Sequence, residues 1–203
     1  GPELFAPEQL ARQYAAPAVS GRDLFYGDQA RLIGFGLNRP SVAPGEWLDV
    51  TACWMATRPM TINHTVFVHL LGRENLVIGA RTTWPGLGRF STSQWPVGRA
   101  FCDTIPVRVE TWANGPELYD IEVGLYDAKT DERLEAVDAG SGQLVAPPIV
   151  GRVRVAPTRP SSVAPQQPAR ADFGPVQLIG YDAAPQAARA GEAIPLRLYW
   201  RAL

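Results

Sequence analysis

The sequence predicts an all-β protein, and three observations predict it. The chain has 203 residues, 46% hydrophobic and 19% charged, which is typical of a globular protein with a sizeable core. Its 19 prolines and 19 glycines are spread between short β-prone runs, and no long stretch has the apolar spacing of a helix. A third observation is an internal repeat, which indicates a module that occurs more than once.

The repeat needs no gaps. The stretch LIGFGLNRPSVAPGEWLDVTACWMA, which begins at Leu32, aligns with LIGYDAAPQAARAGEAIPLRLYWRA, which begins at Leu178. Identical residues keep the same spacing in the two copies, with Leu32, Ile33, Gly34, Gly45, Glu46, Trp54 and Ala56 matched by Leu178, Ile179, Gly180, Gly191, Glu192, Trp200 and Ala202. Residues 172–203 are therefore predicted to be the opening strands of a second, similar module.

The first strands can be placed from their alternation. Residues 1–27 are interpreted as a lead-in rich in Ala and Pro, in which Pro7 suits the start of a short helix. A strand is expected in ARLIGFGL, and the next one, WLDVTACWM, places Leu48, Val50, Ala52 and Trp54 on one face. The second copy keeps apolar residues there, so this face is predicted to point into a core, at Trp200 as well as at Trp54.

The remaining strands complete the first module. TVFVHLL at 65–71 is apolar on both faces apart from His69, as expected of a central strand in a two-sheet sandwich. A hairpin is expected at GREN, a long loop at PGLGRFSTSQWPVG, and further strands in RAFCDTIPVRV, LYDIEVGLYD and IVGRVRVA. About seven or eight short strands in 28–156 predict an antiparallel, immunoglobulin-like β-sandwich. Residues 157–171 are Pro-rich and are interpreted as a semi-extended linker to the second module at 172–203.

Charge and hydropathy exclude some classes of function. A net charge of −1 and a pI of about 6.2 provide no basic surface for nucleic acid. No apolar run reaches the roughly 18 residues needed to span a bilayer, and the N-terminus does not have the pattern of a signal peptide. Tandem β-modules joined by a Pro-rich spacer suit an extracytoplasmic or cell-surface protein.

Several motifs carry a resemblance to a known group of domains. They are LIGF with its copy LIGY, PGEWLDVTACWMA, TVFVHL, TSQW and YDIEVGLYDAKTDER. The chain resembles the extracytoplasmic β-sandwich domains of bacterial membrane proteins similar to GT-C type glycosyltransferases, over about residues 25–155 and 172–203. The resemblance implies a sandwich fold beside a membrane enzyme, and it implies no catalytic role for this chain.

The two cysteines are candidates for a disulfide. By alternation, Cys53 points away from the core, and Cys102 does so too, because Phe101, Ile105 and Val107 should face inward. In an immunoglobulin-like topology the two strands are neighbours, so a cross-strand disulfide is geometrically possible and would indicate an oxidising compartment. The alternative is two free thiols, because sequence does not give the register.

The aromatic residues suggest two roles. Tyr119 enters a strand in GPELYDIEV, a position at which a tyrosine hydroxyl can bond a nearby backbone group and stabilise the fold. Trp84, Trp95 and Trp112 lie in or beside loops, where exposed indole rings could stack on a sugar. The alternative for these three tryptophans is packing over loops and sheet edges.

No catalytic or metal-binding pattern stands out. His64 and His69 should lie on opposite faces of one strand, which makes a shared metal ion improbable. Four acidic residues near one hairpin offer oxygen atoms that could bind calcium, but their spacing fits no EF-hand and acidic residues are common in turns. They are Asp127, Asp131, Glu132 and Asp138. Because no nucleophile elbow, phosphate loop or zinc-protease motif is present, we expect no enzyme, metal or cofactor.

The leading hypothesis is a non-catalytic extracytoplasmic β-sandwich module of a tandem array, acting as a structural or interaction unit. The alternative is a carbohydrate-binding accessory domain that uses the loop tryptophans. Neighbouring copies, contacted through residues 172–203, and glycans are the expected partners. The sequence leaves open whether residues 172–203 continue into a complete module or pair with another copy.

Overall fold

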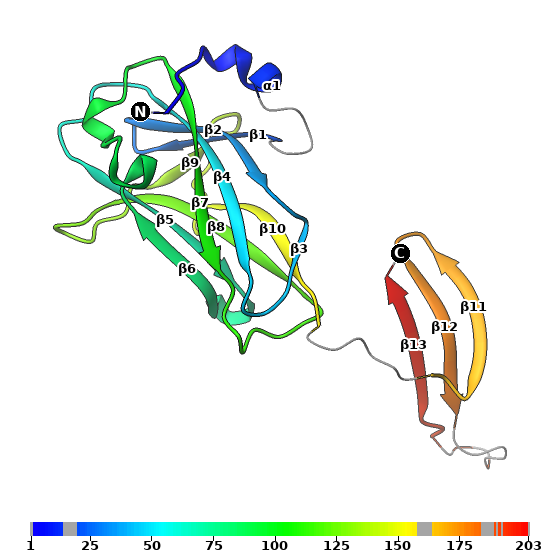
Figure 1. Ribbon diagram of the computed structural model, residues 1–203. Helices are drawn as coiled ribbons and strands as arrows, with labels where there is room; N and C mark the ends of the chain where they lie inside the picture. The colour runs from blue at the N-terminus through cyan, green and yellow to red at the C-terminus, as the bar shows by residue number, and fades with distance from the viewer. Residues whose placement is uncertain are drawn as a thin grey trace. The chain divides into compact units, whose positions relative to one another are not determined.

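The chain forms two compact units, Gly1–Thr158 and Arg159–Leu203, and each is described by itself. This computed structural model describes residues 2–13, 20–157, 164–183, 189, 191 and 193–202. The first unit is a sandwich of two five-stranded sheets, and the second contains one three-stranded sheet (Figure 1). The predicted all-β class, a β-sandwich followed by further strands, is confirmed.

The first sheet has the strand order β7-β4-β2-β1-β9, and all of its neighbours are antiparallel. Its strands are β1 (Ser20–Tyr26), β2 (Ala30–Leu37), β4 (Trp47–Ala56), β7 (Ala100–Arg108) and β9 (Ala136–Asp138). The second sheet has the order β3-β10-β8-β5-β6, with only the β3–β10 pair parallel among its described strands. Its strands are β3 (Ser41–Val42), β5 (His64–Leu71), β6 (Val77–Thr83), β8 (Glu117–Asp127) and β10 (Ile149–Val155).

Short helical segments connect or precede the strands. The predicted helix start at Pro7 is confirmed, because Pro7 opens a 3-10 turn that leads into α1. Residues 14–19, which belong to the same predicted lead-in, lie outside the described residues. The segments are η1 (Pro7–Gln9), α1 (Leu10–Gln13), η2 (Arg73–Asn75), η3 (Pro85–Gly88) and η4 (Thr92–Gln94).

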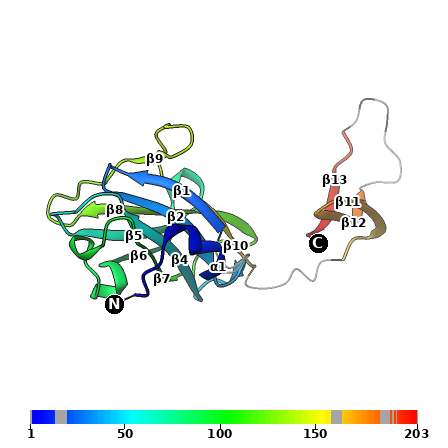
Figure 2. The ribbon, with the colours of Figure 1, turned by 90° about the horizontal axis from the view of Figure 1, so that it is seen from above.

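The core lies between the two sheets, and Figure 2 shows the same unit seen from above. The alternation predicted for β4 is confirmed, because Leu48, Val50, Ala52 and Trp54 are fully buried in it. Two hydrogen bonds also cross between the sheets. The Tyr26 hydroxyl on β1 donates to the Val123 carbonyl at 2.6 Å, and Arg22 Nη2 donates to the Ile149 carbonyl at 2.7 Å.

Two strands begin earlier than the sequence suggests. Residues 20–26, assigned to the lead-in, form β1, and β11 (Gln167–Phe173) begins inside the predicted linker. In β1, Leu24 and Tyr26 face the core and are fully buried, whereas Asp23 is exposed and pairs with Arg31. The polar residues Ser20 to Asp23 hide the alternation, because only the last part of the strand carries apolar side chains.

The second unit repeats the strand pairing of the first. Its strands are β11, β12 (Val176–Ala183) and β13 (Leu196–Ala202), in that order across the sheet. Leu178 opposes Trp200 as Leu32 opposes Trp54, and both pairs are followed by the same irregularity of register. The β11–β12 pair also repeats the β1–β2 pair with its irregularity, although the connecting turn is one residue shorter. The sequence repeat is thus a repeat of hydrogen-bond register.

Candidate functional site

A polar concave region of the first unit lies on the outer face of the second sheet. On β5, Val66, Val68 and Leu70 point into the core, so Phe67 and His69 point the other way. On the neighbouring strand β8, the residues opposite them are Gly124 and Glu122. The strand pairing therefore assembles a row of side chains that are far apart in the sequence.

Phe67 lies over Gly124 and under an arginine. A Cβ at position 124 would collide with the Phe67 ring, so glycine lets the ring settle on the sheet. The Arg133 guanidinium stacks on the ring, 4.4 Å from its centroid, and Phe67 is consequently only 3% exposed. The ring is thus a support for Arg133 and presents no open face to a ligand.

A buried carboxylate fixes two cationic or polar side chains. The Glu122 side chain is 3% exposed, and its Oε2 accepts from His69 Nδ1 at 2.7 Å. Its Oε1 accepts from Arg133 Nη1 at 3.0 Å. Because both carboxylate oxygens have partners, Glu122 meets the hydrogen-bonding requirement of a buried charge and holds Arg133 and His69 in position.

These groups line a pocket of about 330 Å³, at the lower end of the range of small-molecule sites. Thr82 of β6, Tyr126 of β8 and Asp131 of the following turn complete its wall. The Arg133 side chain is 56% exposed, and the described contacts use one of its five N–H donors. The residues that line the pocket are Phe67, His69, Thr82, Tyr126, Asp131 and Arg133.

This pocket was not predicted from the sequence. The strand β5 was expected to be apolar on both faces apart from His69, and Asp131 was considered only as a calcium ligand or a turn residue. The available signal was the pair formed by His69 and Glu122, two polar residues in otherwise apolar strands. The register that places them side by side could not be derived from sequence.

The three predicted sugar-stacking tryptophans do not form one platform. The prediction is wrong for Trp95, which is 4% exposed, packs 4.7 Å from the Phe101 ring centroid and donates its indole N–H to the Phe90 carbonyl. Trp84 and Trp112 are exposed, as expected. They lie near opposite ends of β6, because Glu110 bonds Ile78 at its start whereas Trp84 follows its last residue. At about 3.3 Å per residue, the six residues from Ile78 to Trp84 span roughly 20 Å, so the two tryptophans belong to separate parts of the surface.

The predicted disulfide is present. Cys53 of β4 and Cys102 of β7 lie directly opposite each other and are bonded. Cys53 is outside the core cluster, as its alternation indicated, but it is fully buried. The bond joins the edge strand β7 to its neighbour β4 in the first sheet.

Tyr119 and the histidines follow their predictions. The Tyr119 hydroxyl donates to the Asn114 carbonyl at 2.9 Å, which is the predicted bond to a nearby backbone group. His64 is buried at the start of β5, where burial lowers the pKa of its imidazole, while His69 lies on the outer face. The two rings therefore have no common ligand position.

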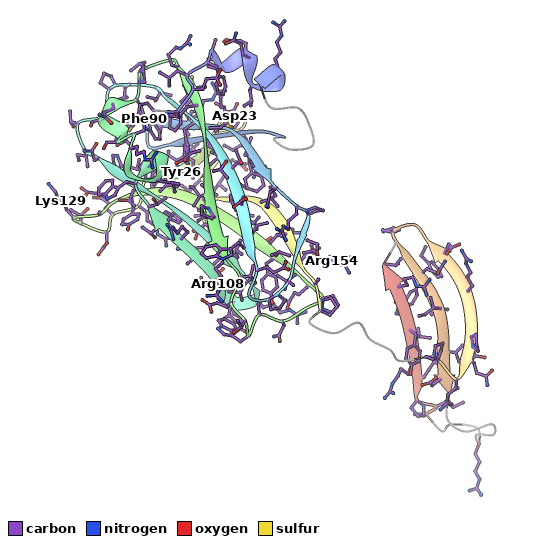
Figure 3. The ribbon with its side chains drawn as sticks, in the orientation of Figure 1. Asp23, Tyr26, Phe90, Arg108, Lys129 and Arg154 are labelled. Atoms are coloured by element: carbon purple, nitrogen blue, oxygen red, sulfur yellow. A yellow bond between two sulfur atoms is a disulfide. The ribbon has the colours of Figure 1, made fainter. Side chains whose placement is uncertain are left out.

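The acidic residues of the hairpin act in its turns. Asp127 Oδ1 accepts from the Lys129 amide, and Asp138 Oδ1 accepts from the amides of Gly140 and Ser141. These bonds lower the pKa of Asp138. Within the described residues, no group of three His, Cys, Asp or Glu side chains is placed to hold a metal ion. Figure 3 shows Lys129 at the tip of this hairpin, and Lys129 is not among the residues that line the pocket.

The second unit presents a different kind of surface. Trp200, predicted to lie in a core, is 49% exposed, so that prediction is wrong for the described sheet. The apolar side chains that correspond to the buried face of β1, β2 and β4 are exposed with it. This apolar face comprises Phe173, Val176, Tyr181, Ile194, Leu196, Leu198 and Trp200.

Comparisons with known proteins add a structural likeness. No family model and no curated protein matches this sequence. Among solved structures, the C-terminal domain of wzt matches with a TM-score of 0.42 and 9% identity, covering 75% of this chain and 95% of that one. None of the described helices is long and apolar enough to cross a membrane. The likeness is too low to carry an argument about function.

Proposed function

We propose that this chain is a non-catalytic interaction unit built from tandem β-sandwich modules, located outside the cytoplasm. The repeated register of β1-β2-β4 in β11-β12-β13 is the observation that carries the proposal. The second sheet has the strand order, the irregular pairs and the apolar face of half a sandwich. A sheet of this kind gains stability when a second sheet covers its face.

The first unit indicates what the covering partner must be. There, the residues that correspond to Leu196, Leu198 and Trp200 are Val50, Ala52 and Trp54, and all three are fully buried. What buries them is a β-sheet with aliphatic side chains at alternate positions. The second unit accordingly assembles with another β-sheet through its apolar face, and we propose that neighbouring copies of the chain make this contact.

The extracytoplasmic location is a further part of the proposal. It is supported by the disulfide between Cys53 and Cys102, because such bonds persist in oxidising compartments. A module attached to a membrane glycosyltransferase, as the sequence resemblance implies, would be found in that setting.

The experiment is light scattering after size exclusion, applied to the full chain and to a version that ends at Pro157. The shortened chain keeps the complete core of the first unit. We expect only the full chain to self-associate with increasing concentration, and we expect the double change Leu196→Asp and Leu198→Asp to abolish the association. If the full chain is a monomer at all concentrations, or if the double variant still associates, assembly through this face is wrong.

A chimera provides a matched control for the shape of the face. Residues 58–157 are appended directly after Leu203, the point at which the repeat would continue, with serine in place of the appended copy of Cys102. We expect the chimera to be monomeric, because the appended sheet covers the apolar face. Compared with the full chain, the fluorescence of Trp200 should be shifted to the blue and protected from quenching, because its ring is buried. A chimera that still associates would contradict the inference that the face fits a sheet of the first unit's type.

Glycan recognition is the second candidate function. The exposed rings of Trp84 and Trp112 favour it, because an indole face can stack on a sugar. The changes Trp84→Ala and Trp112→Ala should each weaken glycan binding if these rings are the contact.

A further inference from the structure

We propose that the pocket on the outer face of β5 and β8 binds a neutral sugar residue of a glycan. This inference rests on the second candidate function, glycan recognition, and assigns it to a site other than the tryptophans. It is independent of the assembly attributed to the second unit.

The pocket is built from supported side chains. Gly124 provides the space for Phe67, Phe67 supports the plane of Arg133, and buried Glu122 fixes the direction of its guanidinium. The same carboxylate orients His69. A polar side chain held on both its planar face and its edge loses little conformational freedom when a ligand binds, which is what a preformed binding site requires.

The lining offers donors and acceptors that suit vicinal hydroxyl groups. Arg133 has N–H groups that can donate to sugar oxygens, and the Asp131 carboxylate can accept from sugar hydroxyls. Thr82 and the Tyr126 hydroxyl can do either. The half-buried Tyr126 ring adds an apolar surface against which the C–H face of a pyranose can pack. A polyol with one apolar face uses every one of these groups.

The charges favour a neutral sugar over an acidic one. Arg133 is already paired with Glu122, and Asp131 adds a second carboxylate to the pocket wall. The local charge is therefore negative when His69 is neutral. The carboxylate of a uronic or sialic acid would be repelled by Asp131 and would compete with Glu122 for the Arg133 guanidinium. An uncharged hexose is not repelled by Asp131 and does not compete with Glu122 as an anion.

The test is titration of the full chain against an array of neutral oligosaccharides, with sialylated and uronic acid oligosaccharides beside them. We expect binding to neutral members. Arg133→Met should lower the association constant about tenfold or more, because a charged donor and its plane are lost. Asp131→Asn should lower it about tenfold. Asn tolerates the positive φ of 58° at this position, so the turn should be kept.

A control on the same loop separates the site from general loop effects. Lys129→Met removes a charge from a residue that does not line the pocket and should change the association constant less than about twofold. The melting temperature of each variant shows whether the fold is kept, and Asp131→Asn supplies a second readout if Arg133→Met is unstable.

Each remaining outcome is informative. If neutral glycans bind but only Trp84→Ala or Trp112→Ala weakens them, glycan recognition stands and the pocket inference is overturned. Preference for acidic glycans overturns the inference of a neutral ligand. If no glycan in either set binds, both glycan recognition and the pocket site are wrong.

Discussion

The sheets β2–β4 and β12–β13 have the same pairing but opposite surroundings. Leu32 opposes Trp54 in the first unit, and Leu178 opposes Trp200 in the second. Trp54 is fully buried, whereas Trp200 is 49% exposed. The comparison teaches that strand register comes from the local sequence, including the irregularity at Gly34 and Gly180, whereas burial requires a second sheet.

The largest predicted difference concerns the two tryptophans themselves. We expect Trp54→Ala to lower the free energy of unfolding of the first unit by about 3–5 kcal/mol, because it empties a fully buried position. Trp200→Ala should leave that unfolding transition within about 0.5 kcal/mol of the parent. Urea denaturation followed by circular dichroism measures both, and equal losses would show that the units do not differ as described.

The next difference concerns the disulfide, because Tyr199 stands in the second unit where the first has Cys53. The bond closes a loop between residues 49 apart in sequence. Changing both Cys53 and Cys102 to Ala should lower the stability of the first unit by about 2–4 kcal/mol. The same denaturation, repeated for the parent with and without a reductant, should give a matching loss. No loss would mean that the bond does not constrain the unfolded chain.

A smaller effect is expected at Tyr26, whose counterpart in β11 is Phe173. Tyr26→Phe gives the first unit the residue of the second and removes the hydrogen bond to the Val123 carbonyl. A loss of about 1–2 kcal/mol is expected, because a buried acceptor is left without that donor. Tyr119→Phe, which removes the bond to Asn114, serves as the comparison at a less buried hydroxyl. An unchanged midpoint for Tyr26→Phe would exclude this bond as a link between the sheets.

The smallest effect is a dependence on alkaline pH. Burial raises the pKa of Tyr26 well above its usual value of 10.0. The folded state therefore holds this proton more tightly than the unfolded state. The resulting stability is fully present below pH 10 and is lost as the pH rises above it, by about 1 kcal/mol between pH 10 and 11. Parallel stability curves for parent and Tyr26→Phe over this interval would contradict the prediction.

Much of the fold could be predicted because its signals are local. Alternation in β4 identified the inward face, and the same alternation placed Cys53 and Cys102 where a cross-strand bond could form. The strand beginning at Ser20 was missed because its first residues are polar, and Trp95 was misplaced because its loop folds back onto Phe101. The alternation of apolar and polar residues predicts the inward face of a strand, but it does not predict how a loop packs.

The candidate pocket was beyond sequence reasoning for a different reason. His69, Glu122 and Arg133 meet only because β5 pairs with β8 in one register and the chain after β8 turns back so that Arg133 pairs with Tyr126. Taken alone, each of these three residues is an ordinary polar residue and does not indicate a pocket. Besides the polar pair His69 and Glu122, Gly124 is a signal, because a small residue in the middle of a strand often marks a position where another group packs closely.

The placement of β1 and β10 in different sheets has a mechanical consequence. A pulling force applied between the start of β1 and the end of β10 must pass from one sheet to the other, because these two strands belong to different sheets. It crosses through the interlocked core and through the bonds of Arg22 to Ile149 and Tyr26 to Val123. The disulfide, confined to the first sheet, lies off this path. Resistance to stretching thus depends on shear between the two layers, with the cystine holding the edge strand in place meanwhile.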